Sequence, residues 1–449
     1  MKVCMISTQF LPTTGGVTNH IRNLSAQLVR LGLSVCVLKP DIEAEDDQRY
    51  VLEGVEVHVV SLGSQIDKKI FGWLKKRSAG GVLGLFWGFM RKCYFNKFYR
   101  QVCNRIEVEH PDVNLFHQHD FVSSIVITKR LSKNRRIVLT NHTGEFLFLR
   151  RLALTRWMIP VMIRHFCHIF APSRELLPQQ EAPDRCTYLP NGVDLKVFDF
   201  DPTSAAGLKA RMGYDPGETL IFCPRRWAPT KGVEYLAKAI PLVLTSVSPE
   251  KKVRFLFAGS DYDHYPHYRQ KVMNILAQSV AEPDVVLLGD VAYEKMPRYM
   301  KAVDIVVIPS IVEATSLAML EAMSCGKIVV ATEVGGSREI VRPGWNGFLV
   351  KPKDVSALAK GLQIAIQLSS SEASRMGRNA RRTVEDSYSW EIVAKEVLGI
   401  YLEALRRLTQ KDSFAPRNAT WDHQPGEVEE QPLAVGTIGP CDAGRYGRA

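Results

Sequence analysis

Apolar runs alternate with amphipathic segments along most of this chain, and the alternation predicts its secondary structure. Residues 2–7 include the run Val-Cys-Met-Ile, which is typical of a buried strand. After a glycine turn, Ile21, Leu24 and Leu28 recur at helical spacing. A second apolar run occupies residues 34–38. Strand, loop, helix and strand in this order predict the repeating unit of a parallel α/β sheet.

The alternation forms two series, separated by a turn-rich segment at residues 189–194. The further runs that we interpret as strands are residues 114–117, 136–140 and 168–171 in the first series, and 220–223, 253–258, 285–288, 305–308, 328–331 and 347–350 in the second. Helical patterns such as residues 233–244 and 315–324 lie between the later strands. We therefore predict two α/β domains, residues 1–190 and 191–387.

The end of the chain differs from the rest. Residues 388–408 have the pattern of an amphipathic helix, whereas residues 409–449 are dominated by Gly, Pro, charged and polar residues, and we expect this tail to be disordered. The length of 449 residues suits two or three domains. With 46% apolar and 23% charged residues, the composition excludes disordered, collagenous and miniature disulfide-rich proteins.

Cysteine usage and hydropathy indicate the compartment. The nine cysteines are scattered and include no Cys-x-x-Cys pair, which argues against a disulfide framework or a zinc ribbon. The first apolar stretch is too short for a signal peptide, and the longest apolar run, residues 79–90, is too short to span a bilayer. We expect a cytoplasmic protein, either free or peripheral on the inner face of the cytoplasmic membrane.

The net charge of +11 is concentrated in one segment. Residues 64–105, here called the basic aromatic segment, contain ten basic residues, one acidic residue and nine aromatic residues. This mixture suits an anionic membrane surface. Two alternatives are binding of single-stranded nucleic acid and helices that merely pack on the first domain with solvated lysines. We favour the membrane and expect no nucleic-acid partner.

Two glutamates eight positions apart are the strongest chemical signal. Glu313 follows the strand at residues 305–308, and Glu321 would lie inside the helix that opens at residues 315–318. The N-terminus of a helix at the carboxyl end of a parallel strand binds phosphate. A carboxylate accepts hydrogen bonds from hydroxyl groups. A phosphate site that is flanked by two hydroxyl-binding carboxylates suits a sugar nucleotide. The alternative is a pair of exposed surface glutamates.

Two further motifs offer anion contacts. Pro-Arg-Arg-Trp-Ala-Pro-Thr-Lys-Gly at residues 224–232 places two Arg and one Lys at a strand end, as an anion clamp or as an ordinary basic loop. Gly15 and Gly16 follow the first strand, where glycine lets the backbone approach a ligand closely. By itself a Gly-Gly pair is weak evidence, and neither a dinucleotide fingerprint nor a Walker A motif is present.

The order of these motifs resembles that of the retaining GT-B glycosyltransferases of family 4. The pattern is Gly-Gly after the first strand, Pro-Asn-Gly-Val-Asp at residues 190–194, Arg-x4-Lys-Gly, Glu-x7-Glu, and Gly-Gly-x-x-Glu at residues 335–339. The resemblance covers roughly residues 1–408. It implies a GT-B fold, in which two Rossmann-like, doubly wound domains face a central cleft, the first domain holds the acceptor, and the second holds a nucleotide-sugar donor. It also implies that residues 388–408 cross back to the first domain and that no metal or other cofactor is needed.

The resemblance assigns roles to residues of the second domain. Arg226 and Lys231 would hold the diphosphate, and Arg226 is preferred to Arg225 because it has the family's spacing to Lys231. Glu313 would bind the sugar hydroxyls, and Glu321 would bind the ribose. The backbone of Ser316 and Leu317 would contact the phosphates. Gly15 and Gly16 would let the first domain close over the donor phosphate. At position 316 the family often has Gly, whereas this chain has Ser.

Histidines near the ends of two first-domain strands are the remaining candidates. By the same resemblance, His119 would reach the donor sugar and act with Glu313 at the reacting carbon, while His142 and Glu145 would lie beside the acceptor. A surface pair formed by His117 and His119 is the alternative. A metal site at this His-x-His segment would need a third ligand, which no neighbouring residue supplies.

These observations together predict an enzyme, a glycosyltransferase of the hexosyltransferase type. We expect it to move a sugar from a UDP- or GDP-sugar to a hydroxyl of a lipid-linked or cell-surface polysaccharide acceptor, with retention of configuration. The basic aromatic segment would bind the membrane, as lipopolysaccharide or other polysaccharide assembly requires. The alternatives are a soluble small-molecule or glucan acceptor and, more distantly, a non-catalytic or nucleic-acid-binding protein.

Overall fold

The computed structural model describes residues 1–12, 15–77, 81–109, 112–119, 129, 131, 135–142, 149–150, 158–201, 204–248, 250–259, 265–279 and 284–409. The predicted disordered tail lies outside the described residues, apart from Thr409. Among the helices that the structure describes, none has both the length and the apolar content that crossing a membrane requires.

The first domain is built on an eight-stranded sheet with the order β3-β4-β2-β1-β5-β6-β7-β8. Its strands are β1 (Lys2–Ile6), β2 (Ser34–Asp41), β3 (Gln48–Leu52), β4 (Val55–Ser61), β5 (Leu115–Gln118), β6 (Arg136–Thr140), β7 (His168–Ala171) and β8 (Cys186–Tyr188). All neighbours are parallel except β3 and β4, which form an antiparallel pair at one edge. The described helices of this domain are α1 (Gly16–Arg30), α2 (Gln65–Arg77), α3 (Gly81–Phe95), α4 (Tyr99–Glu109) and α8 (Met158–Ile163), with short 3₁₀ turns η1 (Asn96–Phe98), η3 (Arg174–Leu176) and η4 (Pro183–Arg185).

The second domain has a six-stranded, wholly parallel sheet with the order β11-β10-β9-β12-β13-β14. Its strands are β9 (Thr219–Pro224), β10 (Val253–Ala258), β11 (Val285–Gly289), β12 (Ile305–Ile308), β13 (Ile328–Thr332) and β14 (Phe348–Val350). Its described helices are α9 (Ser204–Arg211), α10 (Val233–Leu244), α11 (Pro266–Ser279), α12 (Met296–Ala302), α13 (Leu317–Ser324), α14 (Ser337–Ile340), α15 (Val355–Gln367) and α16 (Ser370–Ser387), with 3₁₀ turns η5 (Pro229–Lys231) and η6 (Tyr293–Lys295).

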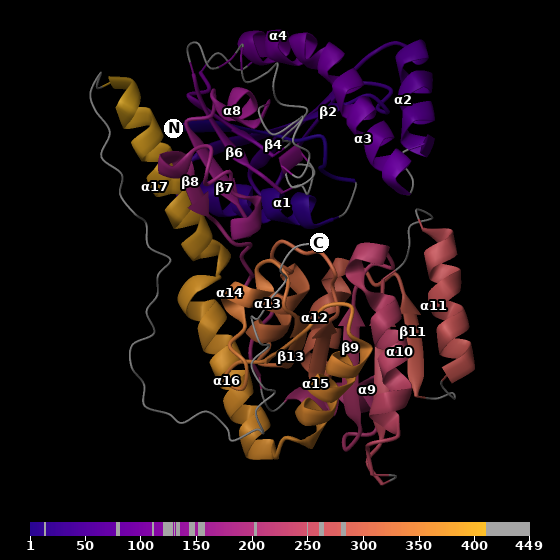
Figure 1. Ribbon diagram of the computed structural model, residues 1–449. Coiled ribbons are helices and arrows are strands. Elements are labelled where there is room, and N and C mark those ends of the chain that lie inside the picture. Colours follow the sequence, from indigo (N-terminus) through magenta and orange to yellow (C-terminus); the bar gives the residue numbers. More distant parts are fainter. Residues whose placement is uncertain are drawn as a thin grey trace, which may run out of the picture.

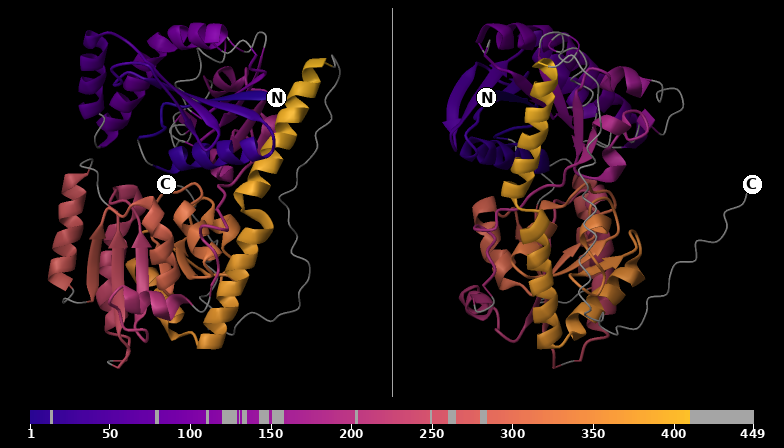
Figure 2. Two further views of the ribbon diagram at one scale, coloured as in Figure 1. Left: turned by 180° about the vertical axis from the view of Figure 1, so that it is seen from behind. Right: turned by 90° about the vertical axis from the view of Figure 1, so that its left-hand side faces the viewer.

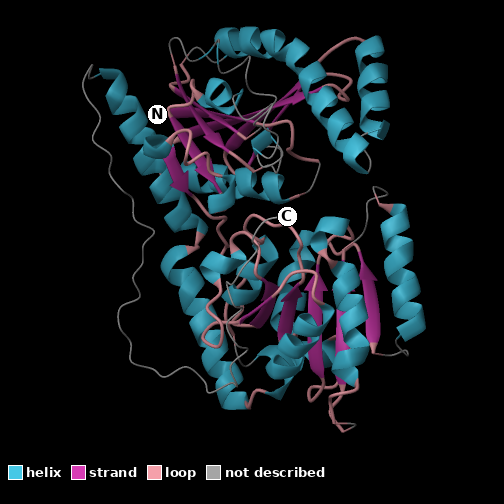
Figure 3. Ribbon diagram, viewed as in Figure 1, coloured by secondary structure: helices cyan, strands magenta, loops and turns pink. Residues whose placement is uncertain are grey.

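The inner strands of each sheet are buried on both faces, and the strand sequences explain why. Successive strand side chains point to opposite faces, so Val3 and Met5 of β1 pack in one core while Cys4 and Ile6 pack in another. Helices cover both faces of each sheet (Figure 3). Runs that are apolar at every position are what such doubly covered strands require. The α/β class and the two doubly wound domains predicted from the sequence are therefore confirmed (Figure 1).

The chain crosses between the domains twice, and the two crossings are tied together. The backbone N–H of Val193 donates to the Tyr388 carbonyl over 2.8 Å, and the N–H of Trp390 donates to the Val193 carbonyl over 3.2 Å. Gly192 has no space for a side chain, because a Cβ there would lie 2.6 Å from the Trp390 ring. The helix α17 (Trp390–Thr409) then runs along the first domain (Figure 2). Its apolar side chains, including Val397 and Tyr401, join the core beneath β1.

Candidate active site

A loop at the carboxyl end of β12 carries Glu313 and leads into α13. The strand β12 is wholly buried, and residues 309–316 follow it. Ser316 ends this loop as the N-cap of α13, because its Oγ accepts a hydrogen bond from the backbone N–H of Met319 over 3.4 Å. A serine cap satisfies one of the free N–H groups of the first turn. The helix therefore begins two residues after the predicted start at Thr315.

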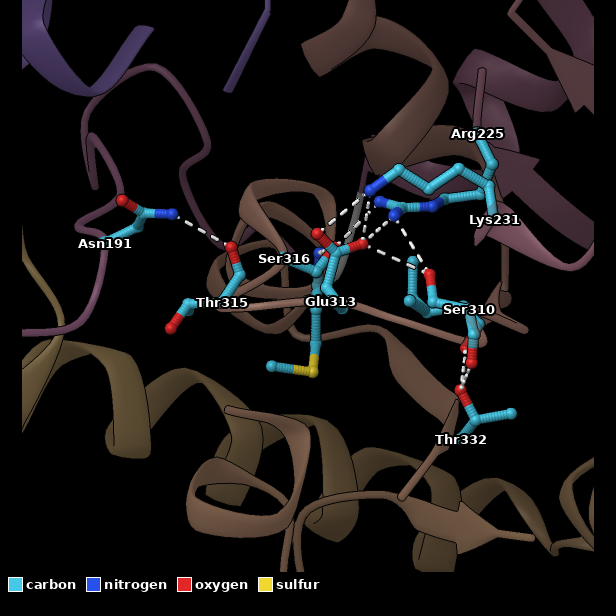
Figure 4. A network of polar contacts seen from close by, with 10 residues as sticks. Asn191, Arg225, Lys231, Ser310, Glu313, Thr315, Ser316 and Thr332 are labelled. Atoms are coloured by element: carbon cyan, nitrogen blue, oxygen red, sulfur yellow. Dashed lines mark hydrogen bonds and ion pairs between the residues drawn. The ribbon is translucent and has the colours of Figure 1, made fainter. Parts of the chain in front are cut away.

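The Glu313 carboxylate lies in a network of cations and hydroxyls (Figure 4). Lys231 Nζ lies 3.0 and 2.9 Å from its two oxygens, and the Ser310 Oγ donates over 3.1 Å. Arg225 forms an ion pair with the same carboxylate. The Arg225 guanidinium also donates to Ser316 Oγ and Ser310 Oγ, each over 3.0 Å. These contacts fix the orientation of Glu313 and connect the strand ends of β9 and β12 with the start of α13.

The two neighbouring arginines of the predicted anion clamp have different environments. Arg225 is buried, and removal from water lowers the pKa of its guanidinium to about 10. Arg226 is exposed, and its side chain makes no hydrogen bond or ion pair with the described residues. It is near enough to Lys231 for its charge to act together with burial, the larger cause, in lowering the pKa of Lys231. The structure thus joins Arg225 and Lys231 to Glu313, while Arg226 remains accessible beside them.

Glu321 lies inside α13, eight residues after Glu313. It is buried, and the hydroxyl of Tyr293 donates to its Oε1 over 3.2 Å. Burial raises the pKa of the Glu321 carboxyl to about 7, although the Tyr293 hydrogen bond and the charge of Arg225 oppose this rise. The group is therefore close to half-ionised at neutral pH.

Two of the glycines in the sequence motifs support the loop at residues 309–316. Gly335 has φ +48°, and a Cβ on it would lie 1.9 Å from the Glu313 carbonyl oxygen. Gly232 has φ +67°, and a Cβ there would lie 1.9 Å from the Pro309 carbonyl oxygen. Only glycine adopts these backbone angles without cost and permits such close contact. By contrast, Gly15 and Gly16 have open space around them at the start of α1.

Three imidazole rings of the first domain converge from separate elements. His119 follows β5 and is buried, His142 follows β6 and is partly exposed, and His20 is buried on α1. His119 Nδ1 lies 3.0 Å from His142 Nε2. One ring nitrogen from each of the three lies within 4.8 Å of the other two. Removal from water, the main cause, lowers the pKa of each ring below its ordinary value, so the three rings are neutral at pH 7.

One asparagine connects these histidines to the second domain. Asn191 Oδ1 lies 2.8 Å from His20 Nδ1, and Asn191 Nδ2 donates to the Thr315 carbonyl over 2.9 Å. The Thr315 hydroxyl in turn donates to the Pro172 carbonyl at the end of β7. Thr315 directly precedes the cap of α13, so the histidines and the Glu313 loop belong to one connected arrangement across both domains.

The sequence motifs do not identify several of these residues. They assign no side-chain role to Tyr293 or Asn191, and they do not single out His20. A signal existed for His20, since a polar ring at residue 20 adjoins the apolar face formed by Ile21 and Leu24. The spacing to Lys231 favoured Arg226 and left Arg225, the arginine that contacts Glu313, unassigned. The acceptor-side candidate Glu145 lies outside the described residues.

Known proteins resemble both halves of the chain. Residues 14–197 match the family model described as glycosyltransferase family 4, and residues 217–367 match the model of glycosyl transferases group 1. The phosphatidylinositol N-acetylglucosaminyltransferase GPI3 subunit of Saccharomyces cerevisiae is 25% identical over 89% of this chain and 82% of its own length. The D-inositol 3-phosphate glycosyltransferase of Segniliparus rotundus is 27% identical over 87% of this chain and 85% of its own.

A solved structure shares the fold. Anabaena HepE, crystallised with UDP and glucose, superimposes with a TM-score of 0.67 at 18% identity, over 90% of this chain and the whole of the other. At this level of identity the likeness shows a common fold.

Proposed function

Because the chain is a glycosyltransferase of the GT-B fold, we propose that it moves a sugar from a UDP- or GDP-sugar to a hydroxyl of a lipid-linked or cell-surface polysaccharide acceptor, with retention of configuration. The observation that carries this proposal is the Glu313 carboxylate, held by Lys231 and Arg225 beside the start of α13. A carboxylate oriented in this way can accept hydrogen bonds from sugar hydroxyls next to a phosphate site.

The donor would bind across the second domain. The accessible Arg226 and Lys231 would contact the diphosphate, and the backbone N–H groups of Ser316 and Leu317 at the start of α13 would contact its oxygens. Glu321 would accept hydrogen bonds from the ribose hydroxyls. Two cations and a helix N-terminus offset the charge of a diphosphate, so we propose donor binding without a metal ion.

His119 would contact the donor sugar. Its Nε2 is buried and has no hydrogen-bond partner among the described residues, so a ligand hydroxyl could satisfy it. Since the ring is neutral, it would act as a hydrogen-bonding group and not as a cation. Gly15 and Gly16 have space around them for the approach of the donor phosphate.

Retention would follow from reaction on one face of the sugar. The bond from the anomeric carbon to the diphosphate oxygen breaks, and the acceptor oxygen forms its bond from the same side. The leaving diphosphate oxygen takes the acceptor proton, so no protein nucleophile is required. Trapping a sugar covalently on Glu313, or on any other side chain, would contradict this route.

A lipid-linked acceptor is supported by one relative and by the surface of the first domain. The yeast relative is named for phosphatidylinositol. In the basic aromatic segment, α2 exposes Ile66, Ile70 and Trp73 at helical spacing. Such a stripe beside lysines and arginines suits insertion into an anionic membrane surface. His142 would lie beside the acceptor, and Glu145 stays a prediction.

A soluble acceptor is the second candidate. One relative, the enzyme from Segniliparus rotundus, is named for D-inositol 3-phosphate. Incubating the protein with radiolabelled donor and either phospholipid vesicles or soluble inositol phosphates would separate the two candidates, because the labelled product partitions with lipid in the first case only.

Thermal-shift measurements with a panel of UDP- and GDP-sugars test the donor proposal. We expect at least one donor to raise the Tm of the wild-type chain and to stabilise Glu321→Ala much less. Glu294→Ala is the matched control, because Glu294 is an exposed glutamate on the 3₁₀ turn that carries Tyr293. If no UDP- or GDP-sugar stabilises the wild type, the proposed donor site is wrong.

A further inference from the structure

We propose that His20, His119 and His142 form a binding site for a divalent transition-metal ion of the zinc class. The three rings come from α1, from the end of β5 and from the end of β6, and one nitrogen of each lies within 4.8 Å of the others. Three imidazoles are a recognised ligand set for Zn²⁺ and leave a fourth position open. The site goes beyond the proposed transfer reaction, which needs no metal.

One of the three nitrogen pairs already has nearly the spacing that a single ion requires. A Zn–N bond measures about 2.0–2.1 Å, so two nitrogens on one tetrahedral ion are roughly 3.3 Å apart. His119 Nδ1 and His142 Nε2 lie 3.0 Å apart, within a few tenths of an ångström of that separation. The same distance also suits an N–H···N hydrogen bond between two neutral rings, which is the alternative that an experiment must separate from the metal site.

His20 is already oriented as a ligand. The Asn191 amide oxygen, 2.8 Å from His20 Nδ1, can only accept a hydrogen bond, so Nδ1 carries the proton and the lone pair lies on Nε2. His20 Nε2 is buried and has no partner among the described residues. A metal-bound histidine typically donates its other N–H to a carbonyl or carboxylate in this manner. Asn191 is itself held by Thr315.

A fourth histidine beside these three is already hydrogen-bonded. The neighbouring His117 is not available as a ligand, because its two nitrogens lie 2.5 Å from the Tyr401 hydroxyl and 2.6 Å from the Thr140 hydroxyl. Its ring stacks on His119 with centroids 4.2 Å apart and restrains that ring. An ion bound by the three histidines would link α1 to the ends of β5 and β6 and, through Asn191, to the start of α13. We therefore expect bound metal to stabilise the folded chain.

Metal binding is measured on the full-length chain, purified without a polyhistidine tag and stripped with EDTA. Calorimetric titration with Zn²⁺ is expected to show one ion per chain, and the wild-type Tm is expected to rise with Zn²⁺ and to fall again with EDTA. Co²⁺ in place of Zn²⁺ reports the ligands by absorption, and we expect ligand-field bands without a thiolate charge-transfer band.

Two variants and one control locate the site. His142→Asn removes a partly exposed ligand with little effect on packing, and we expect it to weaken zinc affinity by at least about 100-fold, more than the loss of an outer-shell partner would. His20→Asn provides a second ligand loss. His267→Ala, which removes an exposed histidine of α11, should leave zinc binding unchanged.

The results that would overturn the proposal are specific. They are no zinc binding by the wild-type chain, equal binding by His142→Asn and wild type, or a thiolate band with Co²⁺ that places the ion on cysteine. Because donor binding is read separately through Glu321→Ala, failure of the metal site and failure of the donor site can be told apart.

Discussion

At the scale of single residues, Arg225 and Arg226 are adjacent in sequence but should differ in what their loss costs. Arg225 is 7% exposed and pairs with a Glu313 side chain that is 12% exposed. Removing Arg225 takes one of two cations away from the buried Glu313 carboxylate, leaving only Lys231, and also removes the hydrogen bonds to Ser310 and Ser316. Loss of a partner from such a buried network costs about 3 kcal/mol. We therefore expect Arg225→Ala to lower the free energy of unfolding by about this amount in urea denaturation.

Arg226→Ala is the matched comparison and carries its own expectation. Since Arg226 is exposed, its loss should change the free energy of unfolding by no more than about 0.5 kcal/mol. If Arg226 contacts the diphosphate, donor affinity in the thermal-shift assay should nevertheless fall by about tenfold or more. If donor affinity is unchanged in Arg226→Ala, then Arg226 does not contact the diphosphate, and only Lys231 and the N-terminus of α13 would bind it.

The raised pKa of Glu321 predicts a pH dependence of donor binding. If the ionised carboxyl accepts from the ribose hydroxyls, affinity should rise by about tenfold between pH 6 and pH 8, as a group of pKa about 7 loses its proton. Calorimetric titration of the donor at both pH values measures this, and Glu321→Gln should show a flat profile. A wild-type affinity that is equal at both values contradicts the ribose role.

The same group affects the stability of the free chain in the opposite direction. The pKa of Glu321 is higher in the folded state than its ordinary value of 4.5, so between about pH 4.5 and 7 the folded chain holds the proton more tightly than the unfolded chain. Its contribution to stability is therefore present at low pH and is lost as the pH rises through about 7. Donor binding is thus favoured by the ionised carboxyl of Glu321, whereas folding is favoured by the protonated carboxyl.

At the scale of elements, the turn that contains Gly335 braces the Glu313 loop, and this predicts a large effect from a small substitution. Gly335→Ala meets both the left-handed backbone conformation and a Cβ contact of 1.9 Å with the Glu313 carbonyl oxygen. We expect about 3 kcal/mol of destabilisation from strain and crowding together. Donor binding should also weaken, because the loop must move.

Gly344→Ala separates the two causes. Gly344 also has a positive φ, +76°, but no atom lies within 4 Å of a Cβ built there. Urea denaturation should therefore show only the conformational cost, about 1–2 kcal/mol, with donor binding unchanged. Equal effects of the two substitutions on donor binding would show that Gly335 does not position Glu313.

Most of the buried strands could be predicted because nearly all of their positions are apolar, but the mostly buried strand β4 was not predicted. β12 and β13 are apolar at nearly every position and were located to within a residue. The edge strand β3 was not predicted, since four of its five residues are exposed and no apolar pattern marks it. The contact between His20 and His119 depends on how β1, β5 and α1 pack. The sequence does not reveal this packing, because the two residues are far apart in the chain.

At the scale of the whole molecule, the positive charge is less concentrated than the sequence suggested. Acidic residues outside the basic aromatic segment neutralise part of it, since Lys75 pairs with Glu43 and Arg105 pairs with Asp47. The apolar stripe on α2 is still exposed. Next to it, the Arg77 guanidinium stacks on the Trp73 ring, 4.1 Å from the ring centroid. The hairpin of α2 and α3 stands at the edge of the first domain opposite α17 (Figure 1).

This arrangement predicts membrane binding through both apolar and electrostatic contacts. We expect the wild-type chain to float with vesicles that contain anionic phospholipid at about 0.15 M salt, and to bind less at higher salt because screening weakens the attraction. Trp73→Ser should weaken vesicle binding by about tenfold, since burying one large side chain contributes roughly 1.5–3 kcal/mol. Lys76→Glu should also weaken vesicle binding, and the loss should be larger at low salt than at high salt.

Leu402→Ser is the matched control for loss of exposed apolar surface. Leu402 is 43% exposed, comparable to Trp73 at 48%, but it lies on α17 at the other edge of the first domain. If Leu402→Ser reduces flotation as much as Trp73→Ser, binding is a general property of the surface and not of the α2–α3 hairpin. If the wild type fails to float at moderate salt, the hairpin has no membrane role, and the soluble acceptor becomes the better candidate.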